Sequence, residues 1–366
     1  MNKKIAGWDI GGAHVKLALL DETGQIGLVD QQACPLWKGV DQLHRVLSDL
    51  LEKYHLQDCR HALTMTGELV DCFSSREQGV KAIIDAVCRQ VNADQVSVFA
   101  GRRGFLPARQ VQPTDCMDIA SANWLASVLL VAKQLPNALF VDIGSTTTDI
   151  LLIENGQLKA QGFTDYQRLV SGELLYTGII RTAVMAIAQE AEFNGQQMGL
   201  MAEHFATMAD VYRLTGELHE AHDQSDTADG AEKTVAASAR RLSRLTGYEF
   251  KDSDLLLWQG FARHLKARQI QKISLACSKQ ILRTEERSTL SVIGAGVGRF
   301  LIKDIAAELG LGYRGFSECL PVASPTTAID AGDCAPAAAV AYLAGNQIHR
   351  SRPFQNVHFG YGTPGY

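Results

Sequence analysis

The chain has 366 residues, of which 46% are hydrophobic and 20% are charged, and its formal net charge at pH 7 is −5. This composition is typical of a large soluble protein with enough apolar side chains for two cores of ordinary size. The negative charge argues against a nucleic-acid-binding protein, and we interpret the basic cluster Arg240, Arg241 and Arg244 as the solvated face of one helix.

Hydrophobic periodicity predicts strands and helices in an order typical of an α/β domain in the first part of the chain. The predicted elements are hairpin strands within 4–33, a helix over Val40–Tyr54, a strand over Ala62–Met65, a helix over Glu77–Val91, a strand over Val96–Phe99 and a helix over Ile119–Leu135. We expect this last helix to end at Pro136.

The second half repeats this order after Ala138. Its predicted helices cover Glu173–Ala191, Ala231–Leu245, Asp254–Ile281, Arg299–Leu309 and Ala335–Leu343. No low-complexity linker separates the halves, so we predict domains over residues 1–136 and 137–348. The Pro-, Gly- and aromatic-rich residues 349–366 form a predicted tail.

A strand–turn–strand motif occurs twice, as GWDIGGAHVKLALL from Gly7 and as FVDIGSTTTDILLI from Phe140. In both copies an aspartate closes an apolar strand, small or hydroxyl residues form the turn, and a second apolar strand follows. Asp9 and Asp142 are equivalent under this repeat, as are Gly11 and Gly144. A repeat of this kind implies two related domains facing each other.

The residue types of these turns suit a phosphate and its metal ion. Glycine lets backbone N–H groups approach an anion, hydroxyls add donors, and an aspartate at a strand end holds Mg²⁺, usually through water. One copy alone is better explained as a tight turn, but two copies in register favour a clamp for a polyphosphate. The predicted metal ligands are Asp9 and Asp142, and the predicted phosphate-binding residues are Gly11, Gly12, Gly144, Ser145, Thr146 and Thr147.

Lys16 stands in an apolar strand directly after the first turn. Burying a lysine there is unfavourable without an anionic partner, so we predict that Lys16 contacts phosphate. The alternatives are a side chain that extends to water and an internal pair with a carboxylate. Asp149, its equivalent in the second copy, is expected to pair with Lys16 or to face the metal.

A third motif, SVIGAGVG from Ser291, is a strand that enters a glycine-rich turn before a helix. Gly294, Gly296 and Gly298 are candidates for substrate or nucleotide binding, although a Rossmann start or simple close packing would look alike. The motif lies late in the chain, which argues against a Rossmann domain.

Gly-Glu-Leu occurs three times, with Glu68, Glu173 and Glu217. A carboxylate is electrostatically favourable at a helix start, which we prefer for Glu217. Glu68 and Glu173 follow segments expected to end at the cleft, with Arg76 and Arg168 nearby, and are candidates for a general base or an amine site.

The stretch from Asp210 to Asp229 contains His219 and His222, but no third metal ligand is fixed by the spacing. We interpret this stretch as an exposed polar connection and residues 226–230 as the N-terminal cap of the next helix. The eight cysteines lack a C-x-x-C pair and indicate reduced, mostly buried thiols in a cytoplasmic protein. No segment predicts a signal peptide or membrane span.

The order hairpin, hairpin, late glycine turn resembles the acetate and sugar kinase, Hsp70 and actin superfamily (the ASKHA superfamily) over essentially the whole chain. In that superfamily the three motifs are called phosphate 1, phosphate 2 and adenosine. The resemblance implies an α/β fold with two duplicated ribonuclease H-like (actin-like ATPase) domains around a central cleft.

A narrower resemblance is carried by Thr66–Asp71, Ser75–Val80, Arg168–Gly178 and Thr227–Gly230, set around the two Asp-Ile-Gly hairpins. These motifs look like the hydantoinase/oxoprolinase-related branch, and most like its proteins linked to tetrahydromethanopterin C1 transfer. Archaeal relatives there are methanofuran-biosynthesis synthases, which join γ-glutamyltyramine to an aminomethylfuran carrying a diphosphate.

This resemblance implies small-molecule substrates, Mg²⁺ at Asp9 and Asp142, and Glu68 or Glu173 as the base for a phenol. Arg76, Arg168 or Arg181 would recognise the glutamyl carboxylates. ATP is not required in this interpretation. The rival interpretation is an ATP-dependent kinase or amidohydrolase that uses the same cleft, and a nucleotide switch is a third alternative without an evident peptide-binding domain. A homo-oligomer is compatible with either activity.

Overall fold

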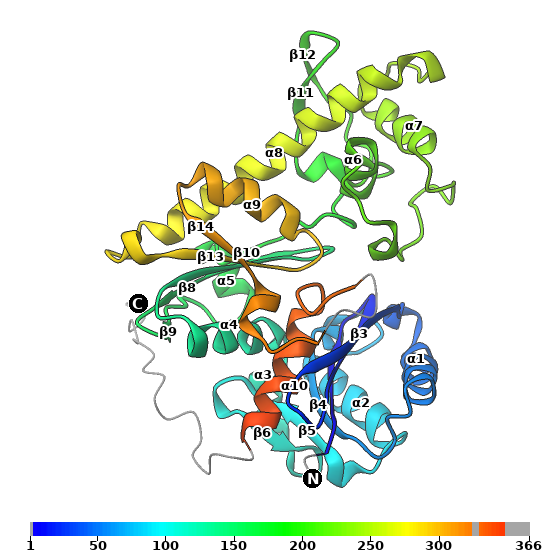
Figure 1. Ribbon diagram of the computed structural model, residues 1–366. Coiled ribbons are helices and arrows are strands. Elements are labelled where there is room, and N and C mark those ends of the chain that lie inside the picture. The colour runs from blue at the N-terminus through cyan, green and yellow to red at the C-terminus, as the bar shows by residue number, and fades with distance from the viewer. Residues whose placement is uncertain (1–2, 324–328, 348–366) are drawn as a thin grey trace. The chain divides into compact units, whose positions relative to one another are not determined.

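The computed structural model describes residues 3–323 and 329–347 (Figure 1), so the predicted tail over 349–366 lies outside the described residues. The chain packs into two compact units. The first contains the residues up to 138, residues 151–160 and the described residues from 314 onward, and the second contains 139–150 and 161–313.

The first sheet has the strand order β3-β2-β1-β4-β5-β6. β2 is antiparallel to β1 and β3, whereas β4 is parallel to β1, and β5 is parallel to β4. Its strands are β1 (Ile5–Ile10), β2 (His14–Leu20), β3 (Ile26–Ala33), β4 (Arg60–Met65), β5 (Val96–Phe99) and β6 (Phe105–Pro107). This is the predicted ribonuclease H-like sheet, with a hairpin first and parallel strands afterwards.

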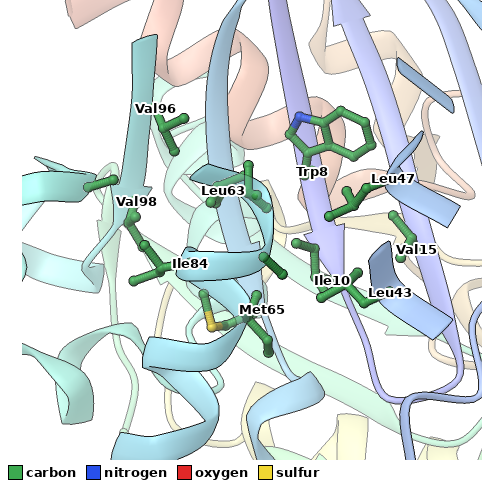
Figure 2. Packing of buried hydrophobic residues seen from close by; sticks show 14 of the residues in the cluster. Trp8, Ile10, Val15, Leu43, Leu47, Leu63, Met65, Ile84, Val96 and Val98 are labelled. Carbon is green, nitrogen blue, oxygen red and sulfur yellow. The ribbon is translucent and has the colours of Figure 1, made fainter. Parts of the chain in front are cut away.

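Side chains alternate along β1, so the two faces of this strand pack against different helices. Trp8 and Ile10 pack toward Leu43 and Leu47 of α1 (Val40–Lys53), as Figure 2 shows, and belong to one buried cluster. Gly7 faces α10 (Ala335–Gln347) so closely that a Cβ there would collide with the Ala337 carbonyl oxygen. Asp9 therefore shares the α10 face, while α1 and α2 (Arg76–Cys88) cover the other face (Figure 1).

The second sheet has the order β10-β8-β7-β13-β14, with β9 also paired to β8. Its strands are β7 (Ala138–Ile143), β8 (Thr148–Glu154), β9 (Gln157–Leu158), β10 (Leu174–Leu175), β13 (Ser291–Ala295) and β14 (Gly312–Gly315). β9 and β10 both run antiparallel to β8, with α5 (Asp165–Ser171) between them in the chain. Together they replace the single strand β3 of the first sheet, so the predicted duplication is confirmed, with an insertion in the second copy.

The rest of the second unit is helical and carries one small hairpin. α8 (yellow in Figure 1) packs against the hairpin, α6, α7 and α9. The elements are β11 (Glu190–Phe193), β12 (Gln196–Gly199), α6 (Met208–Thr215), α7 (Val235–Thr246), α8 (Leu255–Ile281) and α9 (Arg299–Glu308).

One predicted helix is wrong, and another is confirmed with a later start. The segment over Glu173–Ala191 is largely irregular, because Gly172 ends α5 in the left-handed conformation and β10 then joins the sheet. The helix predicted over Ile119–Leu135 is α4 (Asn123–Gln134), which begins four residues later because a break separates it from the short helix α3 (Cys116–Ile119).

The division into units also differs from the predicted boundaries at the C-terminal end. Residues 137–348 were assigned to a second domain, whereas α10 packs on β1 and β2 and belongs to the first unit. The many small residues of α10 allow it to pack closely on β1. The start of the second repeat, which set the predicted boundary, gives no indication of this contact.

Among residues 3–323 and 329–347, no single helix has the length and apolarity to cross a membrane. One pair of helical segments, Pro113–Ile119 and Asn123–Gln134, has the length and composition of a membrane span when taken together, but the two segments are bent by 61° relative to each other. The eight cysteines form no disulfide, and six of them are buried, as predicted for these thiols.

Candidate functional site

The two repeated turns have the same hydrogen bonds. The Gly11 N–H donates to the His14 carbonyl at 2.9 Å, and the Gly144 N–H donates to the Thr147 carbonyl at 2.9 Å. All of Gly11–Ala13 and Gly144–Thr147 are partly exposed. The candidate phosphate-binding residues thus form two equivalent turns that are partly exposed.

The repeat extends to a third turn that the sequence did not link to it. The Thr66 N–H donates to the Ile10 carbonyl at 3.0 Å, and the Gly298 N–H donates to the equivalent Ile143 carbonyl at 2.8 Å. The turn that carries Glu68 is therefore the counterpart of the late glycine turn, although their sequences differ.

In the first unit, Asp9 lies directly opposite Lys16 in the register of β1 and β2. Asp9 is 6% exposed. The Lys16 ammonium donates to the Asp333 backbone carbonyl at 3.1 Å, and the Asp333 carboxylate accepts from the Asp330 N–H at 3.0 Å. Asp9, Lys16 and the turn before α10 therefore meet at one edge of the sheet.

Sequence reasoning missed the turn over Asp330–Asp333. A local signal existed, because Asp-Ala-Gly-Asp directly precedes the small-residue helix α10. The motif is short, however, and Lys16 lies 317 residues away in the chain.

Glu68 is placed beside the first turn by η2, a 3₁₀ helix over Gly67–Leu69. A Cβ on Gly67 would lie 3.1 Å from the carbonyl oxygens of both Ile10 and Gly11. Glu68 itself is 1% exposed and accepts a hydrogen bond from the Ser121 hydroxyl at 2.9 Å.

Arg76 is the first residue of α2, which packs against η2, and it is partly exposed. The structure thus brings Arg76 and Glu68 onto adjacent elements at the first turn. A Cβ at Gly12 would approach the Val70 side chain to 2.7 Å, so this glycine is also required for packing beside η2.

In the second unit, the Gly144 turn is supported by the segment over Gly178–Arg181. The N–H groups of Ile180 and Arg181 donate to the Ser145 carbonyl at 3.1 and 2.9 Å. A Cβ on Gly178 would collide with the backbone N of Thr146. The Gly178–Arg181 segment therefore packs directly against the backbone of the turn and stabilises its conformation.

Gly294, Gly296 and Gly298 are all buried. Gly296 has a φ of +79°, and a Cβ there would collide with the Asp142 carboxylate. Gly294 packs on the Tyr313 ring and Gly298 on Ile143. Close packing therefore explains each glycine, and a role in binding a ligand stays a prediction.

Glu173 is surrounded by hydrogen-bond donors, and its predicted role as a base stays a prediction. It is fully buried and accepts hydrogen bonds from the N–H groups of Gln161 and Gly162 at 2.7 and 3.1 Å. The Ser171 hydroxyl and the Arg283 guanidinium donate to it at 2.9 and 3.2 Å. Four donors from the second unit therefore satisfy this buried carboxylate.

Arg168 has a charged partner inside the second unit, and its predicted contact with substrate stays a prediction. Its side chain is 3% exposed and forms an ion pair with Asp149 inside the second unit. Burial raises the pKa of Asp149, and the adjacent guanidinium opposes this rise. Asp149 therefore pairs with Arg168 rather than with Lys16.

The stretch from Asp210 to Asp229 is not an exposed connection. Arg241, which was assigned to a solvated face, is 1% exposed and pairs with Asp210 at 2.6 Å and Asp229 at 3.2 Å. The helix α7 is capped instead by Thr234, whose hydroxyl accepts from the Ala237 N–H at 3.1 Å. Buried arginine and aspartate side chains thus neutralise one another between α6 and α7.

Within the described residues, no group of three or more His, Cys, Asp or Glu side chains is arranged to hold a metal ion. Mg²⁺ in phosphate sites is usually held by one or two carboxylates together with waters and substrate oxygens. A single aspartate at the end of β1 or β7 fits that type of binding, and a dedicated protein cage is not needed.

Three comparisons place the chain among known proteins. The hydantoinase/oxoprolinase family profile matches residues 60–321. A protein of Methanocaldococcus jannaschii named (4-{4-[2-(gamma-L-glutamylamino)ethyl]phenoxymethyl}furan-2-yl)methanamine synthase is 32% identical over 316 residues, which are 85% of this chain and 91% of that protein. A Methanococcus vannielii protein of the same name is 27% identical over 47% of this chain and 76% of its own length.

Among solved structures, the nucleotide-free acetone carboxylase has a TM-score of 0.52 at 10% identity, covering 93% of this chain and 70% of that one. This likeness bears on the fold alone, and it agrees with the actin-like arrangement of strands described above. The family profile matches more than half of the chain, and the similarity to the Methanocaldococcus jannaschii protein extends over 85% of it, which together establish the family. The chain belongs to the hydantoinase/oxoprolinase family, in the branch that includes these archaeal synthases.

Proposed function

We propose that this protein is a transferase that joins a phenol to a furylmethyl carbon in the biosynthesis of a methanofuran-type cofactor. The observation that carries this proposal is the 32% identity over 85% of the chain to the Methanocaldococcus jannaschii synthase. The name of that relative describes a phenoxymethyl-furan, which is an aryl alkyl ether. Breaking its CH₂–O bond gives a γ-glutamyltyramine phenol and a furylmethyl group that must carry a leaving group.

A diphosphate is the leaving group that suits the two turns. Gly11, Gly12 and Gly144–Thr147 are partly exposed, and glycine- and hydroxyl-rich turns are a residue type that suits phosphate oxygens. Lys16 adds positive charge next to the first turn, where charge accumulates as the diphosphate departs. The aminomethylfuran diphosphate and the glutamyl phenol are thus the proposed small-molecule substrates.

Asp9 and Asp142 are the carboxylates that would hold Mg²⁺, each at the end of the first strand of its repeat. When bound, Mg²⁺ would neutralise charge on the diphosphate.

In the proposed step, the phenol oxygen forms a bond to the furylmethyl carbon while the bond from that carbon to the diphosphate oxygen breaks. The phenol proton passes to Glu68, and the electron pair of the broken bond leaves with diphosphate. A free phenol has a pKa of about 10, so removal of its proton during attack increases its reactivity at neutral pH. Glu68 is preferred over Glu173 because the structure places Glu68 beside the first turn and surrounds Glu173 with donors.

The test is to incubate the purified protein with Mg²⁺, the aminomethylfuran diphosphate and γ-glutamyltyramine, with and without ATP. We expect the ether, followed by mass spectrometry, and an equal amount of diphosphate, both without ATP. Asp9→Asn and Asp142→Asn should each remove most of the activity.

Asp94→Asn is the matched control, because Asp94 is an exposed aspartate of the first unit with a side chain 67% accessible. Activity of this variant should equal that of the wild type. Absence of the ether, together with Mg²⁺-dependent ATP consumption, would overturn the proposal and support an ATP-dependent kinase or amidohydrolase.

A further inference from the structure

Ser121 has an unfavourable backbone conformation at the break between α3 and α4. Its φ is +52°, in the left-handed region that residues with a Cβ rarely adopt. The two helical segments around it are bent by 61° relative to each other. A strained, non-glycine residue is retained only where the surrounding structure stabilises it.

The surroundings of Ser121 are ordered on both sides. The Ala120 N–H donates to the Cys116 carbonyl at 2.8 Å, and the Leu125 N–H donates to the Ala122 carbonyl at 3.1 Å. Ser121 is 7% exposed. The break is therefore a fixed corner that holds the serine in one position.

This corner directs the Ser121 hydroxyl to Glu68. The hydroxyl donates to Glu68 Oε1 at 2.9 Å, although the two residues are 53 positions apart in the chain. An uninterrupted helix over Ile119–Leu135 would have a right-handed conformation at residue 121 and would aim that hydroxyl elsewhere. The backbone strain and the hydrogen bond thus have one common consequence, the orientation of the Glu68 carboxylate.

We propose that Ser121 is a positioning residue for Glu68, which rests on the proposed function of Glu68 as the base. A donor at Oε1 fixes the rotation of the carboxylate plane and therefore the direction of Oε2.

Two substitutions of Ser121 distinguish its effect on the position of Glu68 from its effect on the stability of the fold. Ser121→Gly and Ser121→Ala both remove the hydroxyl, but glycine adopts a φ of +52° without strain and alanine does not. We expect kcat for ether formation to fall by about tenfold in both variants with KM for both substrates unchanged, since a lost positioning contact acts on the transition state. The melting temperature should be lower in Ser121→Ala than in Ser121→Gly.

Ser127→Ala is the control on the adjoining helix α4, because the buried Ser127 hydroxyl has no hydrogen-bond partner among the described residues. Its kcat should match the wild type. A double variant with Glu68→Gln should be no slower than Glu68→Gln alone, because Ser121 acts through Glu68. Normal kcat in Ser121→Gly, or activity that follows only the melting temperature, would overturn the proposal.

Infrared difference spectra of protein with ¹³C-labelled glutamate test the contact without turnover. The carboxylate band that is lost in Glu68→Gln should shift in both Ser121 variants, and an unshifted band would overturn the inference. Wild-type protein that makes no ether would instead contradict the proposed function, so the two failures are distinguishable.

Discussion

Lys16 and Asp149 occupy equivalent positions in the two repeats but have opposite charges and different partners. Lys16 lies across from Asp9 and donates to the Asp333 carbonyl, whereas Asp149 is neutralised by the buried Arg168. The first repeat therefore keeps a cation beside its turn, and the second repeat places its cation in an internal ion pair. The duplicated hairpins share their geometry and differ in their electrostatics.

Replacing Lys16 by Met should reduce kcat/KM by about 100-fold, because it removes the positive charge next to the departing diphosphate while keeping most of the side-chain volume. Steady-state diphosphate release measures this loss. Lys81→Met, at a lysine whose side chain is 78% accessible, should leave the rate unchanged. Equal rates for Lys16→Met and wild type would exclude the assigned role.

Gly296→Ala should weaken diphosphate binding, because the added Cβ would displace the Asp142 carboxylate. The variant should also lose more than the roughly 1 kcal/mol of stability that a left-handed alanine costs in open space. Gly195→Ala is the matched control, since Gly195 has a φ of +74° with no atom within 4 Å of the added Cβ. Calorimetric titration measures the affinity of the two variants for diphosphate, and urea unfolding measures their stability. Equal affinity and equal stability would contradict the argument that Gly296 is required by the nearby Asp142 carboxylate.

Glu173→Gln should lower the free energy of unfolding by about 1–3 kcal/mol, because a buried amide cannot accept all four hydrogen bonds and leaves Arg283 without its carboxylate. Glu68→Gln should instead lower kcat. Urea unfolding and kinetics on folded protein distinguish the two. A larger loss of kcat per folded molecule in Glu173→Gln than in Glu68→Gln would show that the assignment of the base is reversed.

His61 should make the first unit sensitive to acid. Burial lowers the pKa of His61 from 6.5 to about 4, and the Trp8 indole N–H donates to its neutral Nδ1 at 3.1 Å. The depressed folded-state pKa means that this contribution to stability is complete above pH 6.5, the unfolded value, and is lost as the pH falls to about 4. The loss amounts to as much as about 3 kcal/mol by the linkage relation.

His61→Asn, which keeps an acceptor for Trp8, should remove this part of the pH dependence. Urea unfolding at several pH values between 7 and 4 gives the comparison. The wild type should lose more stability than the variant over this interval, and parallel losses would mean that other groups cause the acid sensitivity.

Local patterns predicted the strands and turns that form the two repeats. Apolar alternation and short glycine-rich turns act over a few residues, so β1, β2, β7 and β8 and their connections were visible in the chain itself. The break at Ser121 was not visible, because an apolar run over Ile119–Leu135 is compatible with one helix until packing and the contact with Glu68 are known. The Asn194–Gly195 turn of the β11–β12 hairpin has positive φ at both residues and was a local signal that could have been used.

The sequence by itself determined the duplication, the α/β class, the position of Asp9 and Asp142 on the first strands of the repeats and that of Lys16 on a second strand, because these depend on short-range patterns. Only the tertiary structure decided which charged residues are committed to internal partners. Arg283 reaches Glu173 across 110 residues, and Asp333 reaches Lys16 across 317. Hydrogen bonds between such distant residues exist only after the strands and helices have packed, so no local pattern separates a structural carboxylate from a candidate base.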